Sequence, residues 1–159
     1  MSDQEFRLTE GSKAPSFSLL DQNGQEFYSD KLAGQKAILY FYPAAGSPGC
    51  SKEAADFQDH ISKFTAAGYA VIGISPDEPA KLKDFEDSQQ LTFQLLSDPD
   101  FIAHKAYGAF GTKTLYGRTY EGVLRSTVIV DENFNVIATY YSVRSTGHVE
   151  MLLKRINQR

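Results

Sequence analysis

The sequence predicts one α/β domain in which a central mixed β-sheet carries helices on both sides. Two apolar runs rich in β-forming residues, 37–42 and 69–74, have the composition of strands buried on both faces, as in a parallel sheet. An amphipathic helical pattern lies between these runs, so that strand, helix and strand form a βαβ unit. Shorter segments toward each end of the chain read as antiparallel pairs, which makes the predicted sheet mixed.

The first antiparallel pair is a predicted N-terminal β-hairpin. Segments 17–20 and 25–28 flank an Asn23-Gly24 dipeptide, a strong hairpin signal. In the helical pattern that follows the first apolar run, the apolar residues recur at steps of three and four and therefore share one helix face; they are Ala54, Phe57, Ile61 and Phe64. Gly68 follows where a C-cap is expected. We therefore expect one helix that ends close to this glycine.

The second half of the chain continues the alternation of helices and strands. A weaker helical pattern at 79–89 precedes a short strand at 93–96 and a short helix at 101–107. Segments 123–130 and 136–141 flank the turn Asp131-Glu132-Asn133 and predict an antiparallel pair. The final helix has its apolar residues on one face, namely Val149, Leu152, Leu153 and Ile156. The glycine-containing segment 108–117 fits no phosphate-binding pattern, and we interpret it as a loop.

Length and composition narrow the class of protein. A chain of 159 residues corresponds to about one domain, and no repeat or linker divides it, so we predict a single domain over residues 1–159. With 16 Lys+Arg against 20 Asp+Glu, the chain lacks the basic character of a nucleic-acid binder. No apolar run is long enough to span a bilayer, and the acidic start has no signal-peptide pattern. We expect a cytoplasmic protein that binds neither nucleic acid nor membrane.

The chain contains a single cysteine, Cys50, so an intrachain disulfide is excluded. The three histidines, His60, His104 and His148, lack the spacing of metal ligands, and there is no second thiol. We therefore expect neither a metal nor a cofactor. Nothing in the sequence positions a histidine as the base of a Cys–His hydrolase. Any sulfur chemistry must use one sulfur atom.

The position of Cys50 favours a reactive thiol. The segment 40–53 joins a buried strand to an amphipathic helix at the carboxyl end of the strand, where open α/β sheets bind their ligands. Ser47 is a good N-cap and Pro48 suits the first helical position, which puts Cys50 in the first turn. Unpaired N–H groups and the helix dipole favour a thiolate there. The alternative is an inert cysteine packed in the core as a small hydrophobic residue.

The pattern Pro43-x-x-x-Ser47-x-x-Cys50 resembles the active-site signature of the peroxiredoxins, in which the position of Ser47 is more often Thr. The chain is similar over nearly its whole length to the peroxiredoxin Q (bacterioferritin-comigratory) class. The similar segments are Ala14-Pro-Ser-Phe-Ser-Leu, Ile74-Ser-Pro-Asp, Leu95-Leu-Ser-Asp-Pro-Asp, Lys105-Ala-Tyr-Gly, Leu124-Arg-Ser-Thr and Gly147-His-Val. The resemblance implies a thioredoxin-like fold and thiol-dependent reduction of hydroperoxides.

The resemblance also implies a role for each site residue. Cys50 would attack the terminal peroxide oxygen and become a sulfenic acid. The Ser47 hydroxyl would hydrogen-bond the peroxide and the sulfur, and Pro43 would shield the pocket from water. Arg125 would stabilise the thiolate and the departing oxygen, and Glu53 would orient Arg125. Judged from the residues alone, Ser47 could instead be a helix cap and Pro43 a strand terminator. Arg125 could be a solvated surface arginine, and Glu53 a first-turn carboxylate that suits the helix dipole.

The chain departs from the family pattern at one position. Many peroxiredoxin Q proteins carry a resolving cysteine five residues after the peroxidatic one, where this sequence has Ala55. The sequence is compatible with two origins of Ala55: it is the natural residue, or it has been substituted for a natural cysteine. Without a second cysteine, the sulfenic acid must be reduced by an external thiol: thioredoxin, glutaredoxin or a low-molecular-weight thiol. The alternative function is a redox sensor or binding module without turnover. We expect a monomer or weak homodimer.

Overall fold

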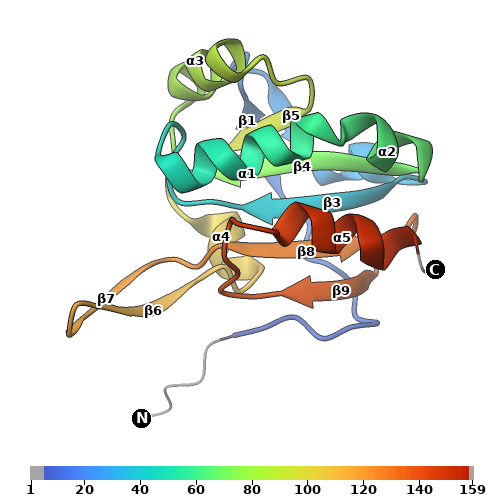
Figure 1. The fold of residues 1–159 in the computed structure, drawn as a ribbon. Helices are drawn as coiled ribbons and strands as arrows, with labels where there is room; N and C mark the ends of the chain where they lie inside the picture. Colours follow the sequence, from blue (N-terminus) through green and yellow to red (C-terminus); the bar gives the residue numbers. More distant parts are fainter. Residues whose placement is uncertain (1–5, 158–159) are drawn as a thin grey trace.

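The computed structural model describes residues 6–157, in which a seven-stranded sheet with the order β2-β1-β5-β4-β3-β8-β9 forms the centre of the molecule (Figure 1). The strands of this sheet are β1 (Ser18–Asp21), β2 (Glu26–Tyr28), β3 (Lys36–Phe41), β4 (Tyr69–Ser75), β5 (Gln94–Ser97), β8 (Ser126–Val130) and β9 (Val136–Tyr140). The pairs β3–β4 and β4–β5 are parallel, and the others are antiparallel. The predicted mixed sheet and its N-terminal hairpin, β1–β2, are confirmed.

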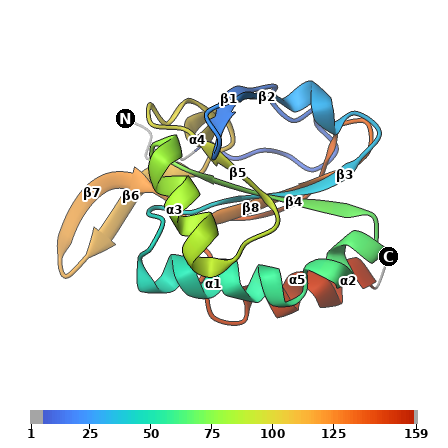
Figure 2. The same ribbon diagram turned by 90° about the horizontal axis from the view of Figure 1, so that it is seen from above.

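Helices cover both faces of this sheet, as the sequence predicts. They are α1 (Pro48–Asp59), α2 (Ile61–Ala66), α3 (Pro79–Gln89), α4 (Ile102–Ala106) and α5 (His148–Asn157), with a 3₁₀ helix η1 (Ser29–Leu32). Figure 2 shows α1, α2, α3 and α5 on one side of the sheet and α4 on the other. Within residues 6–157, no helix is long and apolar enough to cross a lipid bilayer.

The central strand β3 shows why these apolar runs form the middle of the sheet. Ile38 and Tyr40 belong to the hydrophobic cluster under α1 and α5, whereas Leu39 and Phe41 belong to the cluster on the opposite face. Successive side chains of a strand point to opposite faces, so a strand covered on both sides needs apolar residues at every position. The continuous apolar composition of 37–42 therefore follows directly from its two-sided burial.

The helix predicted between β3 and β4 is interrupted. His60 has φ −114° and ψ 14°, which ends α1 at Asp59 and starts α2 at Ile61. The apolar stripe nevertheless continues across the break, because Phe57 and Phe64 are both buried in the same cluster. Periodicity records which side chains face the core, and a single residue with non-helical backbone angles does not disturb it.

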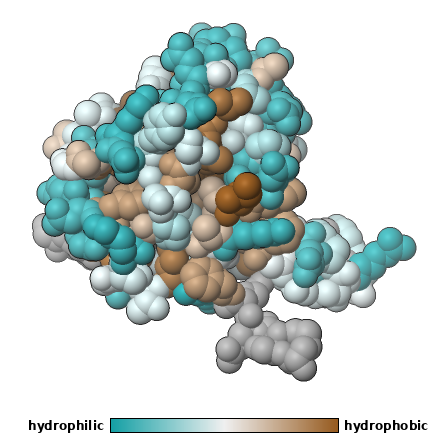
Figure 3. Space-filling view, turned by 180° about the vertical axis from the view of Figure 1, so that it is seen from behind, coloured by the Kyte–Doolittle hydropathy of each residue, from teal (hydrophilic) through white to brown (hydrophobic). Residues whose placement is uncertain are grey.

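The interpretation of 108–117 as a loop was wrong. This segment contains the whole of β6 (Phe110–Leu115), which pairs with β7 (Arg118–Val123) in a separate two-stranded hairpin. Tyr116 and Gly117 make the turn with φ values of 53° and 76°, as a two-residue hairpin turn requires. The hairpin projects from the body and is mostly hydrophilic or neutral (Figures 1 and 3). Because it buries little surface, its sequence lacks the apolar alternation that reveals a strand.

The same hairpin corrects the strand predicted at 123–130. Val123 ends β7, β8 begins at Ser126, and the two residues between them, Leu124 and Arg125, lie outside both strands. Apolar residues at both ends of 123–130 concealed this link, because Leu124 is buried although it lies outside both strands. The link is important for the site described below, because it carries Arg125.

Replacement of Gly73 by alanine is expected to destabilise the fold. Gly73 of β4 lies opposite Tyr40 of β3, and an added Cβ would come within 3.0 Å of the tyrosine ring. Tyr40 is stacked on Phe57 with ring centroids 4.4 Å apart, so it has little room to move. Overpacking of this kind costs about 1–3 kcal/mol. Urea unfolding of Gly73→Ala should show a midpoint well below that of the parent.

Gly122→Ala provides the matched control for this experiment. Gly122 is also a strand glycine, but the nearest atom to its added Cβ is 3.6 Å away, an ordinary contact distance. We expect its unfolding midpoint to stay close to that of the parent. Equal midpoints for the two variants would contradict the close approach of Tyr40 to the β4 backbone.

Candidate active site

Cys50 lies in the first turn of α1, as the sequence predicts. Ser47 occupies the N-cap position with an extended backbone, and Pro48 begins the helix. The Cys50 side chain is buried, with 1% of the residue exposed, and is a free thiol. It belongs to the cluster that includes Tyr40 and Tyr42 at the end of β3. Burial alone would suit an inert core cysteine, so the neighbouring polar groups must decide whether this thiol is reactive.

Arg125 connects Cys50 to Glu53. Its Nη2 donates a hydrogen bond to the Cys50 Sγ over 3.3 Å, and its Nη1 donates to the Glu53 Oε1 over 2.6 Å. The arginine comes from the link between β7 and β8, whereas the other two residues lie on consecutive turns of α1. The structure therefore brings together three residues that the sequence analysis singled out, two of them far from the third along the chain.

Glu53 is an unusual carboxyl group because its side chain is completely buried. Burial raises its pKa from the ordinary 4.5 to about 7, although the charge and hydrogen bond of Arg125 act in the opposite direction. Nearby Asp56 raises the pKa further. Its second oxygen, Oε2, has no hydrogen-bond partner among the described residues. A buried carboxylate of this kind is tolerated only beside a fixed cation, which Arg125 provides.

Ser47 does not cap α1 with its side chain, contrary to the simplest interpretation of its position. Its hydroxyl donates a hydrogen bond to the Ala44 carbonyl over 2.9 Å, while its own carbonyl accepts the first helical bond from Ser51 N. The hydroxyl oxygen therefore keeps its acceptor capacity. Pro43 lines a surface cavity together with Arg125, so it lies on the approach to the guanidinium.

Asp77 is a residue that sequence reasoning missed. One of its oxygens, Oδ2, accepts hydrogen bonds from the Ala45 backbone N over 2.6 Å and from the Ser75 hydroxyl over 2.9 Å. The carboxylate thus holds the segment between β3 and α1 from the end of the neighbouring strand β4. It belongs to the Ile74-Ser-Pro-Asp segment of family similarity, which by itself gives this carboxylate no structural role.

Two further features of the surroundings limit the chemistry that is available. Burial raises the pKa of Tyr40 and of Tyr42, so both hydroxyls stay protonated. Burial and the Arg125 charge lower the pKa of His148 to about 4, and its Nε2 lies 2.8 Å from the Thr127 hydroxyl. A neutral, engaged histidine of this kind is a poor general base, so a Cys–His hydrolase gains no support.

Comparison with known proteins identifies the family. The sequence matches the AhpC/TSA family over residues 11–139. The chain belongs to this family. It is 50% identical over 151 residues to a putative peroxiredoxin of Mycobacterium tuberculosis, covering 95% of this chain and 96% of the relative. It is 34% identical to peroxiredoxin Bcp of Escherichia coli K12, covering 95% and 97% of the two chains.

Solved structures agree with this assignment. The crystal structure of a mutant of PrxQ from Xylella fastidiosa superposes with a TM-score of 0.89 and 26% identity, covering 96% of this chain and 98% of that chain. The peroxidoxin BcpB of Mycobacterium tuberculosis gives a TM-score of 0.83 and 28% identity, with the same coverage. The predicted thioredoxin-like fold and peroxiredoxin Q class are confirmed. The protein is a thiol-dependent peroxidase, and such enzymes reduce peroxides with electrons from thiols.

The raised pKa of Glu53 predicts a specific dependence of stability on pH. Because the folded pKa of about 7 lies above the ordinary 4.5, this carboxyl group favours the folded state below pH 4.5. That contribution is lost as the pH rises through about 7. The free energy of unfolding of the parent, minus that of Glu53→Gln, should therefore decrease from pH 5 to pH 7.5, as urea titrations would show.

Both proteins should carry Cys50→Ser, so that oxidation of the thiol does not contribute to the difference. Glu10→Gln, which removes an exposed carboxyl group, controls for the loss of one negative charge. A difference between parent and Glu53→Gln that is constant across this pH range would show that Glu53 keeps the same protonation state throughout it.

Proposed function

We propose that this peroxidase works with one cysteine: Cys50 is oxidised by the hydroperoxide and then reduced by a thiol from another molecule. The observation that carries the proposal is the hydrogen bond from Arg125 to the Sγ of the chain's single cysteine. A buried thiol in direct contact with a guanidinium has a partner for its negative charge, which an inert core cysteine does not need.

In the oxidative half-reaction, the Cys50 thiolate attacks the terminal oxygen of the hydroperoxide. A sulfur–oxygen bond forms as the oxygen–oxygen bond breaks, and the departing oxygen takes a proton and leaves as an alcohol or water. Arg125 already donates to the sulfur, and it can stabilise the charge that moves from sulfur to the departing oxygen. Glu53 holds the other nitrogen of the guanidinium and thereby sets its orientation.

Two residues of the segment between β3 and α1 complete the proposed site. The Ser47 hydroxyl, which donates to the Ala44 carbonyl, can accept a hydrogen bond from the O–H of the incoming peroxide. Pro43 has no N–H and presents an apolar ring beside Arg125, which reduces the access of water to the charged groups. Cys50, Ser47, Arg125, Pro43 and Glu53 thus form one proposed catalytic unit.

The reductive half-reaction needs a partner, because position 55 is alanine and the sequence contains no second cysteine. A first external thiol condenses with the Cys50 sulfenic acid, giving a mixed disulfide and water. A second thiol displaces Cys50 and leaves as the oxidised disulfide. Thioredoxin, glutaredoxin and low-molecular-weight thiols are the candidate reductants. In this proposal, residues 1–159 act as one domain. The protein works as a monomer or weak homodimer, and it works in the cytoplasm.

Trapping of the intermediates tests this cycle directly. One equivalent of hydroperoxide added with dimedone should give a dimedone adduct in the intact mass of the parent and none in Cys50→Ser. The same oxidation followed by a small thiol should give a mixed disulfide, and excess thiol should support many turnovers per Cys50. Formation of only a disulfide-linked homodimer would contradict reduction by an external thiol. Consumption of about one peroxide per Cys50 would instead support the sensor alternative.

Replacement of Arg125 should impair the oxidative half-reaction. Loss of a preorganised donor to a charged transition state typically lowers the rate about 100- to 1000-fold, and we expect Arg125→Met to lower kcat/KM for peroxide by this factor. Arg125→Lys keeps the charge but has one nitrogen in place of the two that reach Glu53 and Cys50, so the rate should fall by a smaller factor. Stopped-flow measurement of Cys50 oxidation provides the rates.

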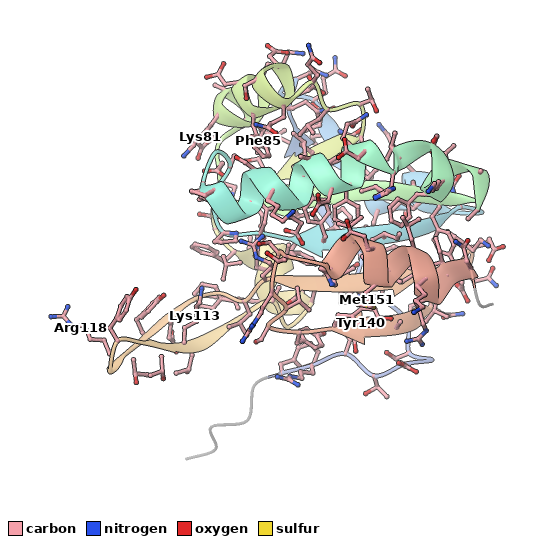
Figure 4. The ribbon with its side chains drawn as sticks, in the orientation of Figure 1. Lys81, Phe85, Lys113, Arg118, Tyr140 and Met151 are labelled. Atoms are coloured by element: carbon pink, nitrogen blue, oxygen red, sulfur yellow. The ribbon has the colours of Figure 1, made fainter. Side chains whose placement is uncertain are left out.

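Arg118→Met is the matched control, because Arg118 is exposed and lies close to the far end of the hairpin, away from the body of the molecule (Figure 4). Its rate should equal that of the parent. Circular dichroism should confirm that Arg125→Met remains folded despite an unpaired Glu53. A folded Arg125→Met with the rate of the parent would refute the role assigned to the guanidinium.

A further inference from the structure

A cavity of about 400 Å³ opens beside Arg125. Residues 112–114 of β6 line it together with Ser142 and Val143, which follow β9, and with Pro43 and Arg125 of the site. Arg125, which lines this cavity, also contacts the reacting atom, because its Nη2 lies 3.3 Å from the Cys50 sulfur. Its volume is in the range of sites that bind small molecules.

The charged groups among the described residues lining this cavity are both cationic, Lys113 and Arg125, in a chain whose net charge is −4. Arg125 already donates to Glu53 and Cys50. Lys113 is half-buried, and its ammonium lies 5.9 Å from the centre of the Tyr120 ring. It forms no ion pair with an acidic group in residues 6–157. Lys113 is therefore the cation that remains available to a ligand.

The hairpin places no carboxylate beside this ammonium. Lys113 lies opposite Tyr120 in the β6–β7 pair, whereas Glu121 lies opposite Thr112. Directly opposed residues share a face and successive residues alternate, so Glu121 projects from the other face of the hairpin. Figure 4 shows Lys113 nearer the body of the molecule and Arg118 close to the far end of the hairpin.

We propose that this cavity binds a carboxylate group of a small substrate through Lys113, so that the enzyme prefers carboxylate-bearing reactants at Cys50. The inference rests on the proposed function, because it takes Cys50 as the reacting atom. A ligand held between Lys113 and Arg125 would have its anionic end on the hairpin and its reacting sulfur or oxygen beside the guanidinium. The carboxylate can belong to the reducing thiol or to the hydroperoxide.

The two sources of the carboxylate act in different half-reactions. A carboxylated thiol would react with the Cys50 sulfenic acid, forming a sulfur–sulfur bond and releasing water, and a second thiol would then regenerate Cys50 and leave as a disulfide. A carboxylated hydroperoxide would transfer its terminal oxygen to the Cys50 thiolate and leave as a carboxylated alcohol after protonation. Because the enzyme is oxidised and reduced in turn, kcat/KM for each reactant can be measured separately.

The experiment compares each acid with its own methyl ester. In the thiol arm, kcat/KM is measured for 3-mercaptopropionate and its methyl ester. In the peroxide arm, it is measured for a fatty-acid hydroperoxide and its methyl ester. For each protein, kcat/KM for the acid is divided by kcat/KM for its ester. This acid-to-ester ratio is then compared between the parent and Lys113→Gln, so that the intrinsic reactivity of each compound cancels. Lys113→Gln removes one partly solvated pair, between Lys113 and the ligand carboxylate, and should lower the acid-to-ester ratio about fivefold in at least one arm. Added salt screens this pair and should lower the ratio of the parent.

Two variants serve as controls. Lys113→Arg keeps the charge and should keep the acid-to-ester ratio of the parent. Arg118→Gln removes the same charge from the end of the hairpin and should also leave the ratio unchanged, which excludes a general effect of net charge. Circular dichroism confirms the fold of each variant.

Each outcome decides the inference. A lower ratio in Lys113→Gln in the thiol arm assigns the carboxylate to the reductant, and a lower ratio in the peroxide arm assigns it to the oxidant. Unchanged ratios in both arms, or equal losses in Lys113→Gln and Arg118→Gln, would overturn the inference while leaving the proposed function intact. Absence of turnover by the parent with hydrogen peroxide and dithiothreitol would overturn the proposed function, and this inference with it.

Discussion

The guanidinium of Arg125, held between a buried carboxyl group and a buried sulfur, is the interaction on which the site depends. It donates to Glu53 over 2.6 Å and to Cys50 over 3.3 Å. Each partner needs the others: a buried Glu53 is costly to ionise without a cation, and a buried thiolate likewise needs a donor. Because Glu53 and Cys50 are three residues apart on α1, one planar side chain can reach both.

The sheet explains how that guanidinium reaches α1. Strand β8 pairs with β3 so that Ser126 lies opposite Phe41, which brings the preceding residue, Arg125, to the end of β3 where the chain turns toward the helix. On the other side of β3, the segment that follows β4 supplies Asp77, whose carboxylate accepts a hydrogen bond from the Ala45 backbone N. Three neighbouring strands thus converge on one short loop. The β6–β7 hairpin ends at Val123, two residues before Arg125. It places Lys113 beside the cavity that Arg125 also lines.

Much of the fold and part of the site could be predicted from local patterns. The two-sided burial of β3 and β4 produces continuous apolar runs, and the start of α1 carries the Ser-Pro pair that places Cys50 in the first turn. These features depend on residues close together in sequence, so periodicity and capping preferences record them. The β6–β7 hairpin escaped detection because it buries few apolar side chains, and the break at His60 because it leaves the apolar stripe intact.

By itself, the sequence determined the class of fold, the position of the single cysteine at a strand-to-helix junction, and the absence of a second cysteine with which it could form an intrachain disulfide. Only the tertiary structure decided which arginine meets that cysteine and that burial raises the pKa of Glu53 to about 7. It also decided that the Ser47 hydroxyl bonds the Ala44 carbonyl instead of a helix N–H, and that Asp77 holds the loop. The reason is physical: each of these depends on burial or on contacts set by packing and strand register. Composition and periodicity report which faces are buried, whereas contacts between distant residues arise only when the whole sheet assembles.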